Sequence, residues 1–307
     1  MTTEAKLVKQ RELDIKHDDK QDTININQLM GSAQGEIERQ LKYFRDRYAV
    51  KGVLSISEMR TNPNQTDLRQ WQRFITKYGT QLMADEEAKY RLDKAKKRAG
   101  FDRNELLSQM VGLSVAYATV NVNKYMADKQ KSEANATMTF HNAVIETQHH
   151  NAKNLANDVQ KKTSDFITAD DHGLTTDQRS WLRTDKLTTD INTAISRGLQ
   201  IGLDDDYYNK HLFTDASAGN HNSLPALFSS ASGYQANTLL RQRKAILVGV
   251  IDQYIATQNR QKHAYWHTVE DNAVCKLCES LAMNSPYTLA KIPGQPHNGC
   301  RCFLIYY

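Results

Sequence analysis

Large apolar side chains recur at helical spacing over most of the chain. From residue 24 to residue 50 they return every three or four positions, which predicts one amphipathic helix. The interval from residue 104 to about residue 166 holds no proline and only one glycine, so we expect long helices there as well. Its first part is apolar around much of its circumference and should be buried, whereas its second part carries a thin apolar stripe that needs a partner helix. Residues 235–260 repeat the helical pattern.

The pattern changes near the C-terminus. Residues 263–268 alternate between apolar and polar positions, as a β-strand does, and residues 303–307 are apolar and aromatic. We expect these two segments to pair. The chain is therefore predicted to be mainly α, with a small α+β module at its C-terminal end.

Composition shifts divide the chain into five regions. Residues 1–22 are polar and are predicted to form an N-terminal arm, followed by an N-terminal helical region at 23–100 and a long-helix body at 101–213. Residues 214–234 are rich in Ser, Ala, Gly and Asn and predict a flexible linker. The remaining segment, 235–307, is the C-terminal module.

Composition also narrows the class of protein. Hydrophobic residues make up 39%, which is lean for one large core and favours an elongated helical body. The net charge of +5 is spread over a mixed surface, which argues against sequence-specific reading of DNA. The polar start predicts no secretory signal, and the most apolar window, residues 111–122, is too short and too polar to span a membrane.

Three polar clusters invite a functional interpretation, and in each case we favour a structural one. The cations of Lys94–Arg98 are expected to lie on a solvated helix face near its C-terminal end. His141, His149 and His150 lack the spacing of a metal site and are expected to be surface residues. The run Asp204–Asp206 lacks the ligand pattern of a calcium loop and predicts the capped start of a helix.

The four cysteines all lie in the C-terminal module, in the pattern C-x2-C…H-x2-C-x-C. Two close pairs of soft ligands can complete a tetrahedron, so we predict a zinc site formed by Cys275, Cys278, His297 and Cys300, with Cys302 as an alternative ligand. Two other chemistries remain open. Disulfides would suit an oxidising medium, and redox or nucleophilic catalysis would require a surrounding βαβ pattern that the sequence lacks.

A catalytic zinc site would need an open coordination position and a general base, for which Glu270 or Asp271 could serve. Five candidate ligands instead favour a closed structural site. A module this small buries little surface by itself, and metal binding would supply the missing free energy of folding. We therefore expect no enzymatic activity and a zinc-stabilised α+β module attached to the helical body.

The order of residues in this module resembles the C-terminal signature of phage Mu-F-like minor head proteins, also described as head morphogenesis proteins. The resemblance covers residues 235–307. The residues that carry it are Trp266, Thr268, Asp271, Cys275, Cys278, Pro296, His297, Cys300, Arg301 and Cys302.

The resemblance implies a low-copy structural protein of a tailed-bacteriophage head, assembled in the cytoplasm of the bacterial host. Its expected partners are the portal protein and the major capsid protein, with packaged DNA as a further, non-specific contact. Its expected role is in head morphogenesis and in the packaging or delivery of DNA. The alternative is a zinc-stabilised DNA-binding packaging accessory protein that contacts phosphates through Lys94–Arg98 and through Arg241, Arg243 and Lys244.

Overall fold

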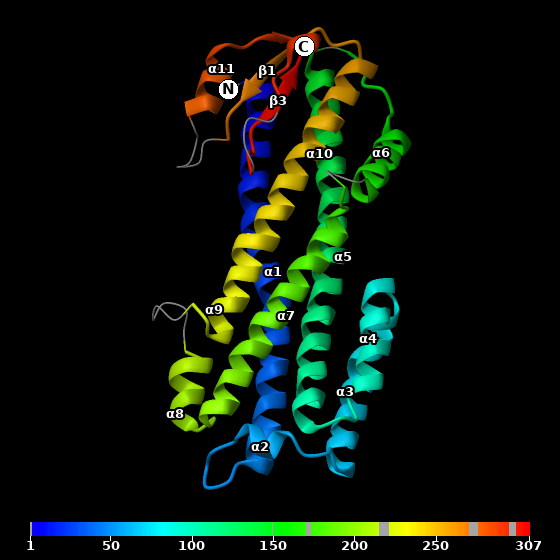
Figure 1. Ribbon diagram of the computed structural model, residues 1–307. Helices are drawn as coiled ribbons and strands as arrows, with labels where there is room; N and C mark the ends of the chain where they lie inside the picture. Colours follow the sequence, from blue (N-terminus) through cyan, green and yellow to red (C-terminus); the bar gives the residue numbers. More distant parts are fainter. Residues whose placement is uncertain (1, 149, 170–172, 215–220, 270–275, 295–298) are drawn as a thin grey trace. The chain divides into compact units, whose positions relative to one another are not determined.

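The computed structural model describes residues 2–148, 150–169, 173–214, 221–269, 276–294 and 299–307 (Figure 1). As predicted, the chain is mainly α-helical with a small antiparallel sheet near its C-terminus. Searching the described residues finds no helix with both the length and the apolar character needed to span a membrane. The elements are α1 (Thr3–Tyr48), α2 (Ile56–Met59), α3 (Gln65–Met83), α4 (Glu86–Arg98), α5 (Arg103–Thr147), α6 (Ala156–Thr168), α7 (Thr176–Ile201), α8 (Asp205–Tyr207), a π-helical turn (Tyr208–Leu212), α9 (Leu224–Ser229), a second π-helical turn (Ser230–Ala236), α10 (Asn237–Gln258), β1 (His263–His267), α11 (Lys276–Met283), β2 (Tyr287–Thr288), a 3₁₀ turn (Leu289–Lys291) and β3 (Phe303–Tyr306).

The chain folds into two compact units built from interleaved segments. The first unit contains Met1–Ile24, Tyr125–Thr176 and Asn237–Tyr307, and the second contains Asn25–Lys124 and Asp177–Ala236. Helices α1 and α5 each contribute residues to both units. This division differs from the consecutive regions expected from composition, because a helix of 45 or 46 residues continues from one unit into the other without any change in composition at the boundary.

Residues 3–22 belong to α1 and do not form the predicted N-terminal arm. Ile15 is buried, and so are the charged side chains of Arg11, Glu12 and Asp22. The polar composition suggested a solvated segment because buried charges are rare. Here they are buried because oppositely charged side chains of the first unit face them: Arg11 pairs with Glu133, Glu12 with Lys9, and Asp22 with Lys244.

The predicted linker at 214–234 is partly helical. Residues 215–220 lie outside the described residues. Helix α9 then begins at Leu224, where the hydroxyl of Ser223 accepts a hydrogen bond from the backbone N–H of Ala226 and so caps the helix. The predicted cap at the triple aspartate is confirmed, because the Asp204 carboxylate accepts from the N–H of Tyr207.

In the second unit, hydrogen bonds at the start of α3 connect it to two other helices. Its N-cap is Asn64, whose side chain accepts from the N–H of Asp67, while the Asp67 carboxylate accepts from the N–H of Asn64. Asp67 is fully buried and also accepts from Tyr48 of α1 at 2.6 Å and from Arg103 of α5 at 3.0 Å. One carboxylate thus holds α1, α3 and α5 together.

A second buried acid in this unit, Glu36 of α1, is surrounded by donors. Its carboxylate accepts hydrogen bonds from Tyr78, Arg39 and Lys77, the last at 3.1 Å. Burial opposes the charged form of Glu36, but these hydrogen bonds, together with one from Gln40, outweigh it and lower the pKa of Glu36 to about 2.

We therefore expect Glu36 to make the second unit sensitive to acid. Because its folded pKa lies below the ordinary value of 4.5, its stabilising effect is present above pH 4.5 and is lost as the pH falls towards 2. Hydrogen exchange of α3 amides should therefore lose protection over this range. In Glu36→Gln the protection should be lower at pH 6 and should depend less on pH, and an unchanged acid response would contradict the assignment.

In the first unit, the thin apolar stripe predicted on the second half of the long-helix region finds its partner in α10. The stripe continues from the end of α5 onto α6, and both pack on one face of α10. This confirms the expected partner helix and the expected helix at 235–260. The buried residues of this core are Ala134, Ile145, Leu155, Val159, Leu247, Ile251 and Ile255.

The predicted pairing of the C-terminal strands is confirmed. The sheet has the order β2-β1-β3, and β1 runs antiparallel to β3 with His267 opposite Phe303 and Ala264 opposite Tyr306. Every residue of β3 is buried, because its two faces pack on different clusters. The cysteine-side cluster contains Ala256, Ala264, Trp266, Cys278, Cys300, Leu304 and Tyr306. The helix-side cluster contains Ile15, Phe140, Val144, Val269, Phe303 and Ile305.

Candidate metal centre

Three cysteines converge in the cysteine-side cluster. Cys278 lies on α11, and Cys300 and Cys302 lie just before β3. The sulfur atoms of all three lie within 4.8 Å of one another, and the Sγ atoms of Cys278 and Cys300 are 3.6 Å apart. All three are free thiols, and Cys278 and Cys300 are buried. The structure therefore brings together two of the predicted ligands and the alternative ligand.

The donor set fits a thiolate-bound metal ion. A tetrahedral zinc ion with Zn–S bonds of about 2.3 Å places its sulfur ligands roughly 3.8 Å apart, close to the separation of Cys278 and Cys300. Cys302 lies close enough to Cys278 and Cys300 to serve as a third sulfur donor alongside them. The other predicted ligands, Cys275 and His297, lie outside the described residues.

Local backbone conformation presents the last two thiols together. Gly299 has a φ of 76°, a left-handed conformation that glycine adopts without strain, and it turns the chain just before Cys300. Beyond this turn the side chains alternate, so that Cys300 and Cys302 share the side of the chain on which Leu304 and Tyr306 also lie.

The thiols differ in acidity. The hydrogen bond from the Cys300 thiol lowers the pKa of Cys302 to about 6 against the effect of burial, and the backbone N–H of Val269 and the side chains of Cys278 and Trp266 act in the same direction. Hydrogen bonding with Cys302 and burial raise the pKa of Cys300. A metal ion that binds here would displace the thiol protons, that of Cys302 most readily.

A cavity of 380 Å³ lies beside Cys302, between α10 and the sheet. Its walls are mostly aliphatic, with Trp266 and Tyr306 also lining it. The one carboxylate among its lining residues, Asp252, is already hydrogen-bonded to His141. The bases considered for a catalytic zinc, Glu270 and Asp271, lie outside the described residues.

The pair formed by His141 and Asp252 corrects one expectation. His141 is 2% exposed, not a surface residue, and its Nε2 lies 2.7 Å from Oδ1 of Asp252. Its spacing within α5 places it on the stripe that faces α10, where Asp252 can reach it. Of the other two histidines, His150 is exposed, as expected, and His149 lies outside the described residues.

The alternative function would use Arg241, Arg243 and Lys244 to contact DNA, but two of these three residues are buried. Lys244 is 1% exposed and pairs with acidic side chains, and Arg243 donates to the carbonyl of Phe166 at 2.7 Å. Arg241 is partly exposed and pairs with Asp19 at 3.0 Å. The cations of Lys94–Arg98 do lie exposed towards the C-terminal end of α4, as expected for a solvated helix end.

The most heavily buried polar feature of the first unit is a charge cluster that sequence patterns did not indicate. Lys244 lies 2.9 Å from the Asp22 carboxylate and 3.3 Å from that of Glu133. Burying charges is costly unless they are paired, and here three buried cations face three acids, with the partly exposed Arg241 and Lys129 at the edge. We call this set the buried charge cluster; it consists of Arg11, Asp19, Asp22, Glu133, Lys244 and Arg301.

Arg301 connects the cysteine centre with the buried charge cluster, because it lies between Cys300 and Cys302 in the chain and its side chain belongs to the cluster. Its Nε lies 3.1 Å from Asp19 of α1, and its Nη2 donates to Glu133 of α5 at 3.4 Å. Burial opposes the charged form of Glu133, but Arg301, Arg11 and Lys244 outweigh it and lower the pKa of the Glu133 carboxyl. The C-terminal module is thus bound to the helices through a residue of its own signature.

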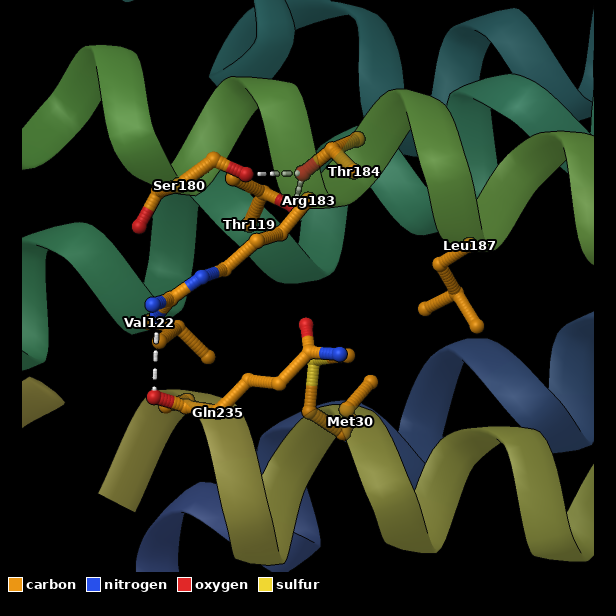
Figure 2. Close-up of a pocket in the computed structure, with 10 residues that line it drawn as sticks. Met30, Thr119, Val122, Ser180, Arg183, Thr184, Leu187 and Gln235 are labelled. Atoms are coloured by element: carbon orange, nitrogen blue, oxygen red, sulfur yellow. Dashed lines mark hydrogen bonds between the residues drawn. The ribbon is translucent and has the colours of Figure 1, made fainter. Parts of the chain in front are cut away.

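A separate small cavity lies in the second unit. Figure 2 shows Arg183 donating to the carbonyl of Gln235 beside the paired hydroxyls of Thr119 and Thr184. Its volume of 40 Å³ accommodates a few water molecules at most, because a single water needs about 10–15 Å³ by this measure. The cavity is too small for a substrate.

The chain was compared with family models, with curated proteins and with solved structures, and none of them matches it.

Proposed function

We propose that the chain is a minor structural protein of a tailed-bacteriophage head. The observation that carries this proposal is the residue order of the C-terminal signature, from Trp266 through the C-x2-C pair to the C-R-C ending. The protein would assemble in the cytoplasm of the bacterial host and remain in the virion. There it would bind the portal protein or the major capsid protein, and act in head morphogenesis and in the packaging or delivery of DNA.

The roles of the signature residues support a structural function rather than an enzymatic one. Trp266 packs in the cysteine-side cluster, the three described cysteines converge on one point, and Arg301 is buried in ion pairs with the helices. Each of these side chains holds the module together or fixes it to the helices. We propose that the metal is zinc and that its role is to stabilise the module.

Fractionation of phage particles tests the proposal. Procapsids and mature heads of a phage that encodes this chain would be separated by density and analysed by quantitative mass spectrometry. We expect the chain in the particles at far lower copy number than the major capsid protein, and cross-linked to the portal or the shell. Absence from both kinds of particle would refute the proposal. If the chain is absent from the particles but the purified protein binds DNA with an affinity that falls steeply with salt, the role of a packaging accessory protein replaces the proposed structural role.

A further inference from the structure

The segment from Cys300 to Tyr306 separates its side chains onto two sides. The even-numbered residues belong to the cysteine-side cluster, and the odd-numbered residues of β3 belong to the helix-side cluster with Ile15 of α1. Arg301 follows the odd-numbered side and reaches Asp19 and Glu133. Because neighbouring side chains of an extended chain point in opposite directions, any ion that fixes Cys300 and Cys302 also directs Arg301 towards the helices.

The N-terminal part of α1 depends on these charges to stay in place. Among the described residues of 2–24, Ile15 is the one buried apolar side chain, and Leu7 and Val8 pack beside it only partly buried, so apolar packing alone fixes this segment weakly. Its remaining buried contacts include Arg11 with Glu133, and Asp22 with Lys244. Removing Arg301 would leave the three acids of the buried charge cluster facing two buried cations, with only the partly exposed Arg241 and Lys129 beside them, and Asp19 would lose a buried partner.

We propose that Arg301 is a positioning residue that couples the cysteine centre to α1: ion binding by Cys300 and Cys302 holds the guanidinium in the buried charge cluster and thereby keeps residues 3–24 docked. Loss of the ion frees the backbone around Arg301, the cluster loses its balance of charge, and the N-terminal part of α1 detaches. This coupling is a property of the isolated chain and does not depend on its place in a virion, so it fails or succeeds separately from the proposed function.

Hydrogen exchange of the full-length protein, measured by mass spectrometry, tests the coupling. In zinc-loaded Arg301→Gln, we expect amides of residues 9–24 to exchange about tenfold faster or more than in the wild type. Zinc content should be unchanged, because Arg301 is not a ligand. Removing zinc from the wild type with a chelator should accelerate exchange of the same residues, while α3 in the second unit stays unaffected.

Two further variants keep the test decisive. Arg241→Gln removes a partly exposed partner of the same Asp19 and should change exchange of residues 9–24 less than about threefold. Arg301→Lys keeps the charge but loses the forked guanidinium, so residues 9–24 should exchange at a rate between those of the wild type and Arg301→Gln. This variant tests the coupling if Arg301→Gln fails to fold. Wild-type exchange of residues 9–24 in zinc-loaded Arg301→Gln would overturn the proposal. So would a purified chain that carries no zinc, or zinc removal that affects only residues 276–302.

Discussion

Replacing Glu133 with glutamine is expected to lower the free energy of unfolding of the first unit by about 3–5 kcal/mol, because it leaves buried cations without their counter-charge. Glu133 is 3% exposed and contacts Arg11, Lys244 and Arg301. The loss should appear in hydrogen exchange as reduced protection of the slowest amides of α10.

A matched control lies on the same helix. Glu146 of α5 is exposed, so Glu146→Gln should change stability by no more than about 0.5 kcal/mol. Protection in the second unit should be unchanged in both variants. A loss below about 1 kcal/mol in Glu133→Gln would show that the buried charge cluster contributes little to stability, as surface ion pairs do.

Replacing Cys278 with serine is expected to abolish metal binding and to unfold the C-terminal module. Structural zinc sites contribute about 10–16 kcal/mol of binding free energy in small domains, so the loss should exceed that of any single packing change in the module. From the sequence alone, loss of the predicted ligand Cys275 is expected to unfold only the module and to spare the helical body. Because Arg301 connects the two, we now expect the N-terminal part of α1 to lose protection as well.

Elemental analysis and hydrogen exchange of the same preparations check this result. Wild-type protein should contain zinc, and Cys278→Ser should not. Glu279→Gln, an exposed change on the same helix, should keep both the metal and the fold. If the wild type contains no zinc and its cysteines are oxidised, the disulfide interpretation replaces the metal centre.

Several elements could be predicted from sequence because a local pattern determines them. The pairing of β1 with β3 follows from two short apolar segments at the end of the chain, and the cap at Asp204 follows from acids at a helix start. The proximity of Cys278 and Cys300 follows from their spacing. In each case neighbouring residues carry enough information, because side-chain period and ligand spacing are local properties.

Other features depend on partners far away in the chain. Residues 3–22 appear solvated by composition, yet Arg11 is buried because Glu133, 122 residues later, accepts its hydrogen bond. His141 is buried for the same reason, since Asp252 lies 111 residues away. No local pattern marks such pairs, because either residue alone would be more stable in water. The alternation of side-chain directions from Cys300 to Cys302 could have been used for prediction, since it places the Arg301 side chain on the side of the chain opposite the two thiols.

The interleaving of the two units has a consequence for synthesis on the ribosome. All segments of the second unit precede residue 237, whereas the first unit also needs Asn237–Tyr307, which is made after them. The N-terminal part of α1 must therefore wait until its partners Lys244 and Arg301 have been synthesised. A nascent segment that waits with Asp19 and Asp22 exposed stays hydrated and resists aggregation, as an apolar one would not. Charge in place of apolar surface thus suits a segment that docks long after its own synthesis.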